Sequence, residues 1–184
     1  MQGVAFIAAF TAINRVDDFA MTPQQNIAHA TTTFMAQNRG AGNIRRMKQG
    51  FLSSVLIQLV YTSVVAVLVF FGARPIMQLF VGDGSEQVIQ LGVSYLRLIA
   101  LMYLMPAATN TIQGFFRGLG DLKVTLISTI LNMSARFFSA WLMIHILHGG
   151  FDRLAWANFF GWVAMLALQI PLIIMRWRKE QQTS

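Results

Sequence analysis

The sequence contains no cysteine, and several chemical motifs are also missing from it. Without cysteine there are no disulfides, no thiolate catalysis and no sulfur-bound metal. The sequence also has no nucleophile elbow, no glycine-rich phosphate loop, no paired catalytic carboxylates and no run of metal ligands. We therefore expect a protein that is not an enzyme, with no cofactor and no metal site.

What the sequence does contain is apolar residues, in long runs with few charges. Apolar residues make up 55% of the 184 residues and charged residues only 11%, a balance typical of membrane proteins. The net charge of +7 does not indicate nucleic-acid binding, because the cations form clusters between apolar runs rather than one basic face. Membrane lipids are the expected partner, and nucleic acid is not.

The apolar runs predict an all-α membrane protein, a single lobe formed by a bundle of about five transmembrane helices. Pro106 is expected to kink the third span. The first is expected to be interrupted around residues 15–23, which is tolerated only where protein or water surrounds the break. The predicted spans are approximately residues 4–37, 51–72, 88–112, 124–147 and 154–175, followed by a cytoplasmic basic tail at residues 176–184.

Lysine and arginine counts in the connecting segments predict the orientation. There are four in residues 37–50, two in 113–123 and three in 176–184, against one each in 73–87 and 148–153. Because cytoplasmic loops of membrane proteins are enriched in cations, we expect a cytoplasmic carboxyl terminus and an external amino terminus. An odd number of spans with this orientation predicts that the chain is part of a longer protein of the plasma membrane.

Asp17 and Asp18 lie inside the first predicted span, next to Asn14 and Arg15. An ionised group at membrane depth costs roughly 2.5 to 3.5 kcal/mol on insertion scales. A carboxylate in a partly dry cavity can exchange a proton or a metal ion for a cationic substrate. The alternative is structural, either an interfacial loop between two short helices or an internal ion pair with Arg15.

Arg97 and Arg136 each lie roughly 13 to 18 Å along their predicted spans at 1.5 Å per residue, near mid-depth. Neither has an acid in its own span. We expect both side chains to point into the bundle, toward Asp17, Asp18 or a carbonyl-rich kink, and we favour a structural ion pair over substrate contact.

Two glycine-rich segments follow helical stretches. Gly40 and Gly42 suit a helix end that needs a positive φ. Gly114 and Gly118 form a GxxxG pattern, which in membrane spans allows close helix packing. Because Gly120 and an acidic residue follow directly, we favour a turn over a packing role for the second pair.

These residues resemble the multidrug and toxic compound extrusion (MATE) family of transporters. The segment FMAQNRGAGN at residues 34–43 follows the polar run RVDDFAMTP and is similar to the family's Gln-Asn-x-Gly-Ala-Gly turn. The segment QGFFRGLGDLK at residues 113–123 is similar to its Gln-Gly-x-x-Arg-Gly-x-Gly-Asp-x-Lys loop. The matching positions, expected to be turns on which helices pivot, are Gln37, Asn38, Gly40, Ala41, Gly42, Gln113, Arg117, Gly118, Gly120, Asp121 and Lys123.

The resemblance implies a transporter of two six-helix halves that exports cationic small molecules in exchange for Na⁺ or H⁺. This chain looks like the carboxyl-terminal half without its first helix, so its expected partner is an amino-terminal half in the same or a separate polypeptide. The family's usual coupling acids fall in absent helices or in the span of Arg97, which has no acid, and this leaves Asp17 and Asp18 as candidates. Alternatives are half of a lipid-linked oligosaccharide flippase, a non-transporting membrane interaction subunit, and an inert truncation product.

Overall fold

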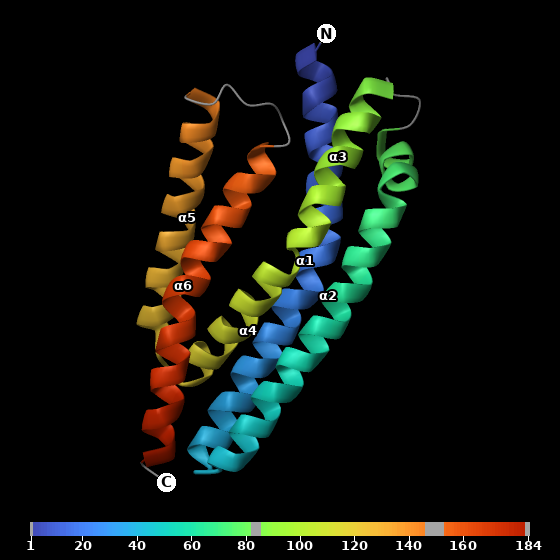
Figure 1. Cartoon of the computed structure of the whole chain (residues 1–184). Coiled ribbons are helices and arrows are strands. Elements are labelled where there is room, and N and C mark those ends of the chain that lie inside the picture. The colour runs from blue at the N-terminus through green and yellow to red at the C-terminus, as the bar shows by residue number, and fades with distance from the viewer. Residues whose placement is uncertain (1, 82–85, 146–152, 183–184) are drawn as a thin grey trace.

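A computed structural model describes residues 2–81, 86–145 and 153–182 of the chain. Over these ranges the fold is a bundle of six helices without a strand (Figure 1). The expected all-α architecture is thereby confirmed. The helices are α1 (Gln2–Gly40), α2 (Ile44–Val81), α3 (Glu86–Met102), α4 (Leu104–Gly118), α5 (Leu122–His145) and α6 (Arg153–Gln182).

Helix α4 occupies the middle of the bundle and packs against α1, α2, α5 and α6. The turn between α1 and α2, the turn between α4 and α5, and the carboxyl terminus all lie at one end of the bundle (Figure 1). The amino terminus lies at the opposite end. The three cation-rich segments identified in the sequence therefore gather at a single end of the molecule.

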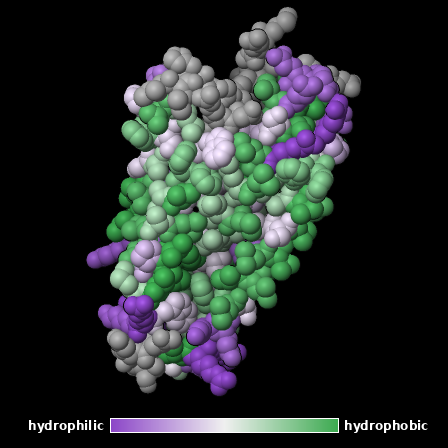
Figure 2. Space-filling view, viewed as in Figure 1, coloured by the Kyte–Doolittle hydropathy of each residue, from purple (hydrophilic) through white to green (hydrophobic). Residues whose placement is uncertain are grey.

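Two of the described helices are long and apolar enough to cross a membrane, over Ile44–Phe80 and Ala155–Glu180, and the bent pair α3–α4 makes a third if it counts as one span. Large apolar side chains are exposed along α2 and α5, for example Leu56 and Ile130. In Figure 2 apolar residues cover the middle of the visible face, while hydrophilic residues gather toward its two ends. This distribution suits a lipid-facing surface.

Helix α1 does not show the interruption that the sequence predicts, since it continues unbroken through Pro23. Proline has no N–H, so Pro23 leaves the carbonyl of Phe19 without its helical partner. The hydroxyl of Tyr61 on α2 lies 3.5 Å from that carbonyl oxygen and 3.3 Å from that of Ala20. A neighbouring helix thus supplies the missing donor, which is how membrane helices tolerate proline.

The expected kink in the third span is confirmed. Helices α3 and α4 meet at Tyr103 with a bend of 45°, three residues before Pro106. A proline ring clashes with the carbonyl four residues earlier, here that of Met102. At the bend, the N–H of Tyr103 bonds at 3.3 Å to the carbonyl of Ala100, three residues back, rather than four residues back as in a regular α-helix. This tighter turn directs α4 across the bundle.

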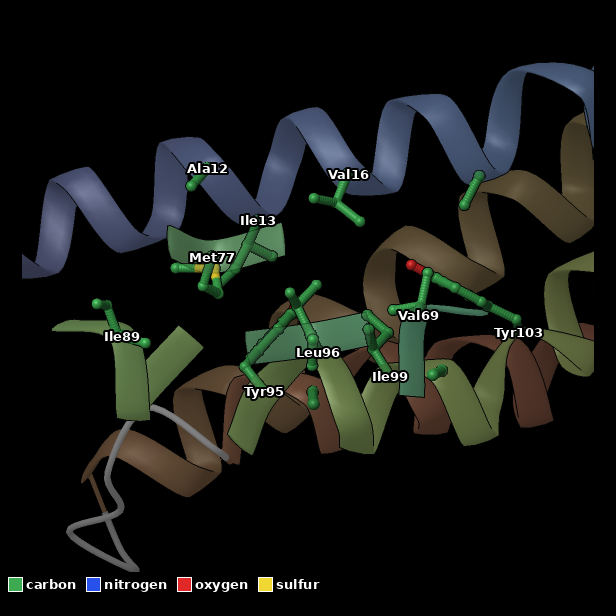
Figure 3. Packing of buried hydrophobic residues seen from close by; sticks show 14 of the residues in the cluster. Ala12, Ile13, Val16, Val69, Met77, Ile89, Tyr95, Leu96, Ile99 and Tyr103 are labelled. Atoms are coloured by element: carbon green, nitrogen blue, oxygen red, sulfur yellow. The ribbon is translucent and has the colours of Figure 1, made fainter. Parts of the chain in front are cut away.

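Two apolar clusters hold the bundle together, one toward each end. Figure 3 shows the first, where side chains of α1, α2 and α3 converge, among them Ile13, Met77 and Leu96. In the second, Met35 and Phe115 pack with Ile173. Between the two clusters the interior becomes polar, and the candidate site lies there.

The GxxxG pair packs against a helix, which differs from the turn role favoured from the sequence. A Cβ on Gly114 would lie 2.6 Å from the carbonyl oxygen of Ala28, and one on Gly118 would lie 2.6 Å from that of Thr32. Both glycines are buried and belong to α4. Their missing side chains let the backbones of α1 and α4 approach closely.

Candidate functional site

Two adjoining polar cavities open between α1 and α5. One has a volume of about 330 Å³ and the other about 310 Å³. Asp17, Arg136 and Asn158 line both, so the two cavities share one wall. The first is lined further by hydrogen-bonding side chains from α1, α4 and α5, which are Gln25, Thr109, Asn110, Gln113, Thr129 and Asn132.

Asp17 is the acid that faces these cavities. Its side chain is partly buried, and its Oδ1 accepts a hydrogen bond of 2.6 Å from the hydroxyl of Tyr103. Tyr103 is the residue at the α3–α4 bend, so the break that Pro106 imposes also places this hydroxyl. The carboxylate could bind a proton, and together with the surrounding amide oxygens it could bind a small cation.

Arg136 faces the same cavities from α5. Among the ion pairs of the described residues, none joins Arg136 to Asp17. The close approach of α6 is possible because Gly161 has no side chain, where a Cβ would lie 2.9 Å from Cδ of Arg136. The sequence predicted a paired Arg136. Instead a carboxylate and a guanidinium line one cavity without direct contact.

The other charged candidates lie outside this shared wall. Asp18 and Arg15 are exposed on α1, and Asn14 lines only the second cavity. Arg97 is exposed and contacts α2, where its Nε donates to the carbonyl of Phe70 at 3.4 Å and its guanidinium lies 5.8 Å from the Phe70 ring centroid. Arg97 therefore does not point into the bundle as the sequence predicted, and it pairs with neither aspartate among the described ion pairs.

Helix α1 also carries a polar stripe, which the sequence reading missed. Its six residues are spaced by three or four positions and all are exposed, namely Asp18, Thr22, Asn26, His29, Thr33 and Gln37. This spacing places them on one helix face. The spacing of three or four positions is itself visible in the sequence. A continuous polar face on a membrane helix must contact water or protein rather than lipid.

The two motif turns share one local geometry. The N–H of Asn43 bonds to the carbonyl of Asn38 at 2.9 Å, and that of Asp121 to the carbonyl of Phe116 at 2.9 Å. In each, a glycine with positive φ precedes the last residue, at 66° for Gly42 and 73° for Gly120. Both are therefore Schellman caps, built by the recurring pattern Arg-Gly-x-Gly followed by Asn or Asp. Gly40, expected to share this role, is instead the last residue of α1.

Side chains join these turns to each other and to α6. Arg39 donates to the carbonyl of Leu119 in the second turn and lies 3.7 Å from the carboxylate of Glu180. Arg176 lies 3.4 Å from the same carboxylate. The predicted tail belongs to α6, which is helical as far as Gln182, and Glu180 is buried within it. Arg39 thus connects the first turn to both the second turn and α6.

Gln113, which matches the first position of the second motif, belongs to the cavity rather than to a turn. Its Nε2 donates to Oγ1 of Thr129 on α5 at 3.1 Å. Arg117 donates from Nε to the carbonyl of Gln113 at 3.4 Å. Lys123 lies exposed in the first turn of α5.

Comparison with known proteins identifies relatives longer than this chain. The family model MatE matches residues 1–142. A probable multidrug resistance protein NorM of Thermotoga maritima is 25% identical over 157 residues, covering 83% of this chain and 31% of that protein. A FAD transporter of Shewanella oneidensis is 26% identical over 131 residues, covering 69% of this chain and 28% of that protein.

Solved structures share the fold. An outward-facing multidrug resistance MATE family transporter superposes with a TM-score of 0.88 at 19% identity, covering 98% of this chain and 40% of that one. An inward-facing one gives a TM-score of 0.86 at 19% identity, covering 96% and 40%. The chain thus spans less than half the length of the proteins it resembles.

Proposed function

The chain belongs to the MatE family of membrane transporters, and from that premise we propose that it is one lobe of an efflux transporter that exports cationic organic compounds in exchange for Na⁺ or H⁺. The family and the fold indicate a multi-pass membrane transporter and not an enzyme. The observation that carries the finer proposal is Asp17, a partly buried carboxylate held by Tyr103 at the wall of two polar cavities.

The coupling ion binds at Asp17. A carboxylate at membrane depth has a free-energy cost that a bound cation or proton removes, so occupation of the site changes the energy of the lobe. Because Tyr103 lies at the α3–α4 bend, a change at Asp17 is transmitted directly to the joint between these two helices. A bend of this kind can take different angles in different states of a transporter.

The polar stripe of α1 faces a water-filled path shared with a second lobe. Its six side chains are exposed in this lobe, and the hydroxyls of its two threonines, Thr22 and Thr33, bond back to carbonyls of their own helix. Such hydroxyls need no external partner and can contact passing solutes. The carboxylate of Asp18 gives the path a negative charge suited to cations, and α1 thus separates the ion site from the substrate path.

The lobe sits in the plasma membrane with its basic end in the cytoplasm. The two basic turns and the carboxyl terminus share one end of the bundle, and cytoplasmic loops are rich in lysine and arginine. On this assignment α1 and α5 also cross the membrane, which gives five crossings when α3 and α4 count as one.

A flippase for lipid-linked oligosaccharides would need several cations in its cavity. The two cavities described hold Arg136 beside Asp17, and Arg97 lies against α2 instead. One cation balanced by one acid is too little positive charge for the phosphates of such a lipid, so the cavities do not favour a flippase.

The proposal predicts that export requires a second lobe. Proteoliposomes are prepared with this chain alone and with this chain plus a separately expressed amino-terminal half of a MatE transporter, and export of a cationic dye is measured under a Na⁺ or H⁺ gradient. We expect export only from the paired vesicles, abolished when the gradient is collapsed. Gradient-driven export by this chain alone would contradict the two-lobe proposal, and a complex of the two halves that exports nothing would favour an interaction subunit.

A further inference from the structure

A groove on the outside of the α1–α2 pair is not used by the proposed transport path. Its volume is about 500 Å³. The residues farther from the basic end are apolar, with Ile27 on α1 and Ile57 on α2. Toward the α1–α2 turn the lining becomes polar, ending with Ser53 and Arg46. The groove therefore combines an apolar floor along the two helices with a cationic mouth near the basic end.

Contacts with α1 and α2 hold the cation at the mouth of the groove. The guanidinium of Arg46 lies 6.0 Å from the centroid of the Phe34 ring, so the ring holds the charge at the edge of the groove. The ring itself lies against the backbone of α2 at Gly50, where a Cβ would collide with it. Glycine at this position leaves the recess in which Phe34 packs.

Arg46 also forms no ion pair with another residue that the structure describes. Among the ion pairs of the described residues none involves Arg45, Arg46 or Lys48, although Arg39 nearby is paired with Glu180. Cations in basic pockets between helices at the cytoplasmic side of a membrane attract anionic lipid headgroups. The charge at the mouth and the apolar floor together match the two parts of a phospholipid.

We propose that the α1–α2 groove binds an anionic phospholipid, with the headgroup phosphate at Arg46 and one acyl chain along Ile27 and Ile57. Ser53 and Ser54 provide hydroxyl donors between the two regions. A bound lipid bridges α1 and α2 at residues that belong neither to the polar stripe nor to the two polar cavities. This inference goes beyond the transport proposal and depends only on the chain lying in a membrane.

Arg45 provides the matched control, because it is also exposed and adjacent but does not line the groove. The purified chain in detergent is titrated with phosphatidylglycerol, phosphatidylcholine or soluble glycerol phosphate, and bound molecules are counted by native mass spectrometry. We expect phosphatidylglycerol to bind most tightly, Arg46→Gln to weaken its binding about fivefold, and Arg45→Gln to leave it close to the original.

A second variant tests the groove apart from its charge. Ser54→Phe keeps every cation but fills part of the groove. We expect this variant to bind phosphatidylglycerol more weakly while circular dichroism shows unchanged helicity. Equal losses in Arg45→Gln and Arg46→Gln would overturn the proposal in favour of diffuse attraction to the basic end. Equal binding of the two lipids, tight binding of glycerol phosphate alone, or full binding by Ser54→Phe would overturn it as well.

Discussion

Replacing Asp17 by Asn is expected to lower gradient-driven export about 10- to 100-fold in the paired transporter. The amide keeps the size of the side chain and can still accept a hydrogen bond from Tyr103, but it carries no charge to bind Na⁺ and cannot take up the coupling proton. Charge-assisted interactions contribute about 1.5 to 3 kcal/mol each, which corresponds to this range. The measurement is the initial rate of cationic dye export from vesicles with and without the ion gradient.

Asp18→Asn is the control one residue along the same helix. Asp18 is exposed on the polar stripe, whereas Asp17 lines the cavities. We expect Asp18→Asn to weaken the apparent affinity for a cationic dye but to keep the dependence on the ion gradient. If Asp18→Asn removed gradient dependence and Asp17→Asn did not, the ion site would be misplaced by one helix face.

Adding a single methyl group at Gly114 or Gly118 is expected to destabilise the lobe by about 1 to 3 kcal/mol, the usual cost of overpacking. The reason is the approach of α4 to α1, where each new Cβ would lie 2.6 Å from a backbone carbonyl oxygen, of Ala28 and Thr32 respectively. Backbone atoms cannot rotate away as the end of a side chain can. Unfolding of Gly114→Ala and Gly118→Ala in mixed micelles, followed by circular dichroism, measures the loss.

Gly40→Ala is the matched control for this pair. Gly40 occupies in the first turn the position that Gly118 occupies in the second, yet no atom lies within 4 Å of where its Cβ would be. We expect Gly40→Ala to unfold like the original chain. Comparable destabilisation by Gly40→Ala and Gly118→Ala would mean that the turn conformation, rather than helix packing, requires these glycines.

The sequence predicted the fold well where local chemistry decides it. The turns at Gly42 and Gly120 follow from glycine's access to positive φ, and the bend before Pro106 follows from the ring and the missing N–H of proline. Both are properties of short segments. Neither requires knowledge of which helices become neighbours.

Features that depend on distant contacts were not predictable. The first helix continues through Pro23 because the hydroxyl of Tyr61, on α2, donates to the backbone carbonyls of Phe19 and Ala20. Gly118 is needed for the surface of α1 and not only for its own turn. Likewise Tyr103 became part of the candidate site only when the bend brought its hydroxyl to Asp17.

Cysteine accessibility along α1 tests the central claim that its polar stripe faces the transport path. The chain has no cysteine, so single substitutions at Asp18, Asn26 and Gln37 report without background when the amino-terminal half also lacks cysteine. Ala41→Cys in the exposed turn and Leu56→Cys on the apolar surface of α2 set the upper and lower limits. In the paired transporter in membranes, stripe positions should react with a charged thiol reagent at rates near that of position 41. Rates as low as that of position 56 would contradict the account.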